Sequence, residues 1–127
     1  EAYRKACPHA YIAVGMAAEN VLGIHGSIEY NGKIVAGMFP HDQVKIVAEA
    51  GANNFGAVVN TNTSKSFAWN VARSATMIKE CVKQSEIPVH ADLGMGVGGV
   101  PMCEVPPTDC VTRAGKILIE IANIDGI

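Results

Sequence analysis

The sequence predicts an α/β fold with a parallel sheet, as part of a (β/α)8 barrel with about three βα units in the 127 residues. Strand-like apolar runs alternate with amphipathic helical segments, and this order implies parallel strands joined by right-handed crossovers. The turns that lead into strands are short, whereas the loops that follow strands are long. A barrel of this type builds its active site from the loops after its strands. A doubly wound sheet shares this asymmetry and stays open as the alternative.

The first βα unit carries a predicted insertion. The chain opens with the end of a helix that Pro8 breaks, and a strand follows over Tyr11–Gly15. In the next loop, Asn31-Gly32 between two β-prone runs predicts a tight hairpin turn. This hairpin is expected either at the mouth of the site or as a surface decoration. A helix then has Pro40 in its first turn and Gly51 as its C-terminal cap.

The second unit combines a short apolar strand with a long amphipathic helix. The strand is expected at Phe55–Val59, and the helix begins near Thr63 or Ser64 and continues to about Lys83. Its apolar positions recur at helical spacing, which predicts one buried face. The residues of this face are Phe67, Val71, Ala75, Ile78 and Val82.

The third unit follows Pro88. A strand is expected at Val89–Leu93, and after a loop rich in glycine and proline Thr108 caps a helix. Beyond this helix, Asp125-Gly126-Ile127 has the pattern of the first residues of another buried strand. The predicted buried face of the helix consists of Val111, Ala114, Leu118 and Ile121.

The composition narrows the classes of partner. With a net charge of −2 and only ten lysines and arginines, the chain lacks the basic surface that nucleic-acid binding needs. No apolar stretch approaches the ~20 residues that span a bilayer, and no basic run favours an anionic membrane. Nothing at the first residues resembles a signal peptide. We therefore expect a cytoplasmic protein with no nucleic-acid or membrane partner.

Cysteine and histidine spacing predicts no metal site. Cys7, Cys81, Cys103 and Cys110 contain no Cys-x-x-Cys pair, so free thiols are expected, with a metal pair from Cys103 and Cys110 as the alternative. The histidines lack the spacing that places two imidazoles on one helical face.

The glycine-rich stretch Gly94–Gly99 matches the G-x-G-x-x-G pattern and follows a predicted strand. A dinucleotide site also needs a helix that begins inside the motif, so that its first amides meet the pyrophosphate. Here prolines delay the helix to Thr108, and the acid about twenty residues on, Glu120, lies on a helix. The glycines fit a tight loop over a cavity better. A phosphate- or nucleotide-binding α/β domain that uses this loop stays an alternative.

Polar and acidic residues gather where the predicted strands end. Each taken alone has a structural explanation, as a turn former or a hydrogen-bonded residue of the sheet. Together they describe an acidic, hydrogen-bonding cavity, which suits a small cation better than a phosphate. The candidate residues are Glu19, Asn60, Asn62, His90, Asp92 and Glu104.

Three long segments resemble the dimethylamine:corrinoid methyltransferases: "AGMFPHDQVKIVAEAGANNFGAVV", "NTNTSKSFAWNVARS" and "HADLGMGVGGVPMCEVPPTD". The resemblance covers essentially the whole chain, although a tryptophan is expected where Phe39 stands. It implies a TIM barrel, and it implies a pyrrolysine, encoded by an in-frame amber codon, directly after Ile127. The 127 residues are then expected to be a piece of a longer protein, cut at both ends.

The implied reaction moves a methyl group from dimethylamine to the Co(I) corrinoid of a partner protein and releases monomethylamine. The corrinoid belongs to that dimethylamine corrinoid protein, so this chain is expected to bind no cofactor of its own. From their positions in the loops, Glu19, Asp92 and Glu104 are expected to hold the ammonium group and relay its proton. Asn60 and Asn62 are expected to orient the substrate beside His90. A catalytically inactive truncated product is the alternative, and the full-length protein is expected to be a homo-oligomer.

Overall fold

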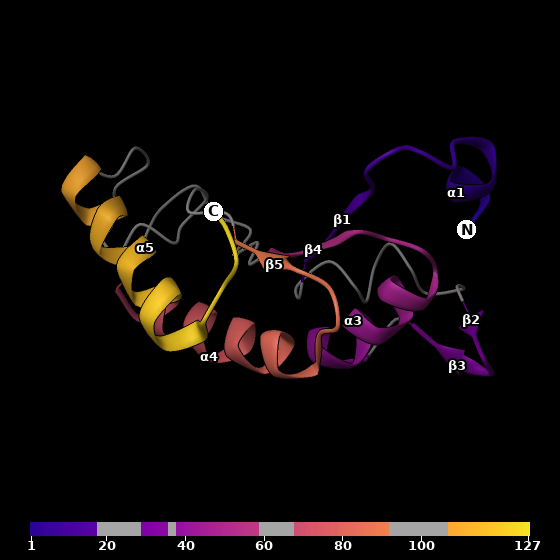
Figure 1. The fold of residues 1–127 in the computed structure, drawn as a ribbon. Coiled ribbons are helices and arrows are strands. Elements are labelled where there is room, and N and C mark those ends of the chain that lie inside the picture. Colours follow the sequence, from indigo (N-terminus) through magenta and orange to yellow (C-terminus); the bar gives the residue numbers. More distant parts are fainter. Residues whose placement is uncertain (18–28, 36–37, 59–67, 92–106) are drawn as a thin grey trace.

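The computed structural model describes residues 1–17, 29–35, 38–58, 68–91 and 107–127. Its centre is a parallel sheet of β1 (Ala13–Ala17), β4 (Asn54–Val58) and β5 (Val89–His90), in the order β1-β4-β5 (Figure 1). The order of the strands in the sheet is therefore their order along the chain. This confirms the predicted α/β class with parallel strands.

The C-terminal residues continue the sheet beyond β5. Gly126 forms a parallel bridge with His90, and the Ala91 N–H donates to the Gly126 carbonyl at 3.2 Å. Asn123 ends the preceding helix in the left-handed conformation, with φ 57°, which turns the chain toward the sheet. Of the strand start predicted at Asp125–Ile127, the structure has this single bridge, and Ile127 is exposed.

Three helices pack on the same face of this sheet: α3 (Pro40–Glu49), α4 (Ala68–Gln84) and α5 (Thr108–Ala122). Consecutive helices pack side by side, α3 against α4 and α4 against α5 (Figure 1). The predicted start of α4 near Thr63 lies outside the described residues, since Ala68 is the first residue described there. This arrangement is that of part of a barrel wall, and one half of a doubly wound sheet shares it.

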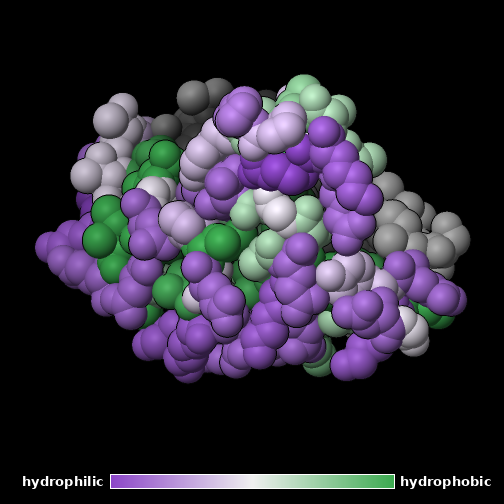
Figure 2. All heavy atoms as spheres, turned by 45° about the vertical axis from the view of Figure 1, so that its right-hand side comes forward, coloured by the Kyte–Doolittle hydropathy of each residue, from purple (hydrophilic) through white to green (hydrophobic). Residues whose placement is uncertain are grey.

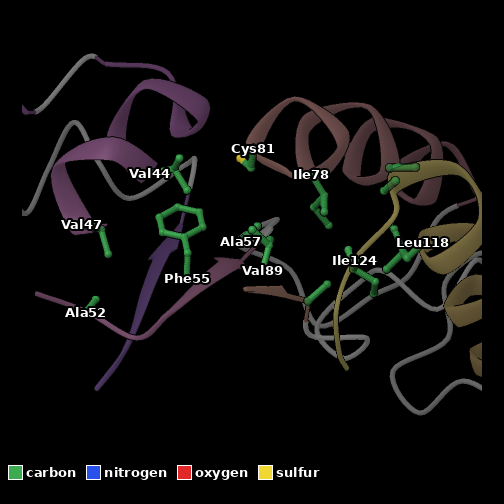
Figure 3. Packing of buried hydrophobic residues seen from close by; sticks show 13 residues of the cluster. Val44, Val47, Ala52, Phe55, Ala57, Ile78, Cys81, Val89, Leu118 and Ile124 are labelled. Atoms are coloured by element: carbon green, nitrogen blue, oxygen red, sulfur yellow. The ribbon is translucent and has the colours of Figure 1, made fainter. Parts of the chain in front are cut away.

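The core fills the space between the sheet and these helices. Phe55 of β4 is fully buried beneath Val44 of α3, and Ile78 of α4 and Leu118 of α5 complete the same cluster (Figure 3). Phe55, Ala57, Val89 and Ala91 alternate along β4 and its neighbour, as strands with one face on helices require. The helical period predicted for α4 is confirmed by the burial of Val71, Ala75 and Ile78.

The short helix α1 (Ala2–Ala6) is tied to the start of the sheet through Arg4. The Arg4 Nε and Nη2 atoms donate to the Gly51 carbonyl at 3.1 and 2.9 Å, and Nη1 donates to the Ala10 carbonyl at 2.7 Å. Arg4 also contacts Asn53 Oδ1, which accepts from the Ile12 N–H at 3.0 Å. One guanidinium therefore joins the chain before β1 to the turn before β4.

The predicted hairpin is present as β2 (Glu29–Tyr30) and β3 (Lys33–Ile34). Asn31 and Gly32 have φ angles of 50° and 75°, as a type I′ turn requires. The Tyr30 hydroxyl donates to Glu49 Oε2 at 3.0 Å, which fastens the hairpin to α3. This hydrogen bond raises the pKa of Tyr30, since it stabilises the protonated phenol.

Several predicted boundaries and contacts were wrong. β1 begins at Ala13, two residues after the predicted start at Tyr11. Thr108 is the first helical residue and makes no side-chain cap, because Pro107 occupies the cap position. Ile121 is 50% exposed, because Ala122 and not Ile121 lies one turn beyond Leu118 on the buried face.

Candidate functional site

The sheet face turned away from the helices carries small and polar residues. Because side chains alternate along a strand, Asn54 and Gly56 face opposite to Phe55 and Ala57. The register pairs Gly15 with Gly56, Gly56 with His90, and His90 with Gly126. Three of the four residues in this row across the sheet are therefore glycines, and His90 is the one large side chain.

His90 is half-buried at the carboxyl end of β5, and its ring lies across the neighbouring strand. Its Nδ1 atom is hydrogen-bonded to Asn54 Oδ1. A Cβ atom added at Gly56 would stand 2.9 Å from both Cε1 and Nε2 of the ring. The imidazole therefore occupies the space that any side chain at position 56 would need.

This arrangement defines the hydrogen-bonding character of the ring. The amide oxygen of Asn54 carries no hydrogen, so Nδ1 is the atom that donates. In the neutral imidazole Nε2 is then an acceptor. Nε2 can thus accept a hydrogen bond from an N–H or O–H group that approaches the edge of the ring.

Of the predicted site residues, His90 alone falls within the described part of the chain. The other five, Glu19, Asn60, Asn62, Asp92 and Glu104, lie outside it. Glu19, Asn60 and Asp92 each come two residues after the last residue of a strand, β1, β4 and β5 respectively. These strands are parallel neighbours, so their carboxyl ends meet at one edge of the sheet.

Sequence reasoning missed Asn54 and Gly56. The predicted strand began at Phe55, one residue after Asn54, and Gly56 lay inside it with no role assigned. A signal was present, since Asn54-Phe55-Gly56-Ala57 alternates between polar or small residues and core residues. Such alternation indicates that one face of the strand is not covered by helices.

The described cysteines are free thiols in different settings: Cys7 is exposed, Cys110 is half-buried and Cys81 is fully buried in α4. Burial away from water raises the pKa of Cys81 from 9.0 to about 12. Across the described ranges, no group of three histidine, cysteine or acidic residues is placed to hold a metal ion. The alternative pair of Cys103 and Cys110 is untested, because Cys103 lies outside these ranges.

The glycine motif Gly94–Gly99 also lies outside the described residues. The helix that follows it, α5, begins at Thr108. Its N-terminal amides therefore belong to residues well beyond the motif, as the sequence predicted.

Two apolar grooves flank α5, away from His90. One of about 610 Å³ runs along Val111, Gly115 and Ile119 to Ile127, and one of about 520 Å³ lies between α4 and α5 beside Ile117 and Ile121. On the hairpin side of the molecule, hydrophobic side chains form small patches among mostly hydrophilic ones (Figure 2). Each groove also has a lysine and a glutamate in its lining, Lys116 and Glu120 in the first and Lys79 and Glu80 in the second.

Within the described ranges, no helix is both long and apolar enough to cross a bilayer.

A comparison with protein families gives one match that spans the chain: the model described as dimethylamine methyltransferase matches residues 1–127. No solved structure matches this chain.

Proposed function

Since the chain belongs to the dimethylamine methyltransferase family, we propose that it forms part of an enzyme that methylates a corrinoid protein. The methyl donor is dimethylamine, the acceptor is the Co(I) corrinoid of a separate partner protein, and the other product is monomethylamine. The observation that carries this proposal is the family match over the full length of the sequence.

The proposal includes a (β/α)8 barrel. Three features of the fold support it: the strand order follows the chain, the three large helices share one face, and Gly126 bridges to β5. In a barrel the opposite face is the interior, and catalytic groups stand at the carboxyl ends of the strands. His90 and the predicted loop residues then surround one cavity.

The transfer is a displacement at a methyl carbon. The carbon–nitrogen bond breaks with its electron pair left on nitrogen, and the electron pair of Co(I) forms the new carbon–cobalt bond. Dimethylammonium thus becomes monomethylamine, and the corrinoid product is methyl-Co(III). A pyrrolysine directly after Ile127, which the resemblance to the family implies, would supply an electrophilic imine to which the amine nitrogen could add. This chain contributes binding, orientation and exclusion of water.

The side chains after the strands suit a small cation. In this proposal Glu19, Asp92 and Glu104 neutralise the ammonium charge and carry its proton, while Asn60 and Asn62 orient the substrate. A carboxylate that accepts a hydrogen bond from an ammonium group forms a charge-assisted bond, which is stronger than a neutral one. In the same proposal His90 adds a hydrogen-bond acceptor, Nε2, beside these side chains.

The test uses the full-length enzyme, made with pyrrolysine, and a corrinoid protein reduced to Co(I). Dimethylamine should produce the absorbance change of methyl-cobalt formation together with an equal amount of monomethylamine. Trimethylamine and monomethylamine serve as controls for substrate choice. Absence of transfer from dimethylamine, with a corrinoid protein that is methylated by another route, overturns the proposal.

A further inference from the structure

We propose that Asn54 and Gly56 are positioning residues that hold His90 with Nε2 as the hydrogen-bond acceptor for the N–H of a small secondary ammonium ion. This inference rests on the proposed function and names two residues that act through a third. The three residues come from two neighbouring strands, β4 and β5.

Asn54 decides which ring nitrogen of His90 carries the proton. A free histidine exchanges its proton between the two ring nitrogens, so either nitrogen can be the donor. The amide oxygen of Asn54 accepts from Nδ1 and so retains the proton there. Nε2 is then the ring nitrogen that carries the lone pair, and it lies over β4, where a Cβ at Gly56 would stand 2.9 Å from it.

The glycine at position 56 leaves space for the His90 ring. The strands place Gly15 and Gly56 side by side, and we call this pair the glycine shelf. A Cβ at Gly56 would lie 2.9 Å from Nε2 and 3.2 Å from the Gly15 Cα, and both distances are too short for carbon contacts. Glycine at position 56 is therefore what lets the imidazole lie over β4.

An acceptor nitrogen on His90 also favours one class of ligand, a small cation with N–H groups. An acceptor nitrogen attracts a cationic N–H donor and repels an anion such as phosphate, whose oxygens are also acceptors. Gly15 is exposed and has no side chain, so the surface beside the ring is open at Gly15, whereas Gly56 is buried under the ring. A secondary ammonium ion has two N–H bonds and two small methyl groups, which fit an acceptor above a flat surface.

The experiment compares three changes in the full-length enzyme. Asn54→Leu keeps the approximate size and removes the acceptor, Asn54→Asp keeps an acceptor oxygen, and Gly56→Ala pushes the ring away. Loss of a charge-assisted hydrogen bond to the substrate should raise the KM for dimethylamine roughly ten- to a hundredfold in Asn54→Leu and Gly56→Ala. The kcat should change much less, because the lost contact binds substrate before the reaction. Asn54→Asp should retain the parent tautomer.

Gly126→Ala is the matched control. It adds the same methyl group on the other side of His90, where the new Cβ would lie 3.9 Å from the His90 Cβ, an ordinary contact. The His90 tautomer should therefore be the same as in the parent enzyme.

A direct readout is ¹⁵N NMR of the labelled His90 ring in the parent and each variant. The parent should be protonated at Nδ1, and Asn54→Leu should move the proton toward Nε2. A parent ring protonated at Nε2, or an Asn54→Leu variant with KM within twofold of the parent, overturns this inference and leaves the proposed function standing. A parent enzyme that transfers no methyl group from dimethylamine overturns the proposed function, while the NMR result still decides the role of Asn54.

Discussion

Asp125 and Val89 hold each other through two hydrogen bonds of different kinds. The Asp125 backbone N–H donates to the Val89 carbonyl at 2.9 Å, and the Val89 N–H donates to the Asp125 Oδ2 atom at 2.8 Å. The side chain thus takes the place of a backbone acceptor at the point where a new strand joins β5. Together these bonds set the register that brings Gly126 beside His90.

Replacing Asp125 with alanine should loosen this strand start. The backbone N–H of the buried Val89 would lose its acceptor, and the free energy of unfolding should fall by roughly 1–3 kcal/mol. Amide hydrogen exchange at Val89 and Ala91 should become faster in the full-length protein, while exchange in α3 stays unchanged. Asp125→Asn keeps an acceptor oxygen and is the control. Equal exchange rates in Asp125→Ala and the parent would mean that the side-chain bond does not hold the strand.

Arg4 should not be replaceable by lysine. The guanidinium donates to three carbonyls in fixed directions, whereas an ammonium group cannot make the paired contact with Gly51. Arg4→Lys should therefore lower the free energy of unfolding by about 1–3 kcal/mol, as measured in urea. Lys5→Ala, one residue along on exposed surface, is the control and should have little effect. A lysine variant as stable as the parent would contradict this role.

Cys81 should resist alkylation in the folded protein. With a pKa of about 12, only about one thiol in ten thousand is ionised at pH 8, and the thiolate is the reactive form. Cys7 is exposed and should react first. Iodoacetamide labelling followed by peptide mass spectrometry locates the label. Labelling of Cys81 at the rate of Cys7 without denaturant would show that the thiol is accessible.

The same thiol gives stability a pH dependence. The folded pKa is raised above the unfolded value near 9.0, so the folded state keeps its proton to higher pH than the unfolded state. The contribution of the Cys81 thiol to the free energy of unfolding is complete below about pH 9 and is lost as the pH rises through about 12. Unfolding in urea across this range should show a steeper loss of stability in the parent than in Cys81→Ala. If the stability of the parent and of Cys81→Ala fell equally with pH, the raised pKa of Cys81 would be contradicted.

The acidic residues after the strands give a prediction about rate. Asp92→Asn and Glu104→Gln keep size and remove one negative charge each from the proposed cation cavity. Loss of a charge-assisted hydrogen bond should cost roughly 1.5–3 kcal/mol, or about ten- to a hundredfold in methyl transfer from dimethylamine. Docking of the corrinoid protein, measured separately, should hardly change. Rates within twofold of the parent for both variants would leave these carboxylates with a structural role.

The sequence by itself determined the features that depend on neighbouring residues. Asn31-Gly32 predicted the hairpin because both residues adopt positive φ, and Gly51, with φ 93°, ended α3 for the same reason. The apolar period of α4 predicted its buried face, because a helix repeats its faces along the chain. The alternation of strands and helices likewise predicted a parallel sheet, since crossovers of that length return the chain in the same direction.

Only the tertiary structure decided which residues meet across strands. Asn54 and His90, and likewise Val89 and Asp125, are each 36 positions apart, and their contacts depend on the register between strands. A shift of one residue would turn every side chain of a strand to the other face, and no local propensity reports that choice. The register also decides what lies over Gly56, which in the sequence looks like any other glycine in a strand. Its function depends on a ring that arrives from the next strand.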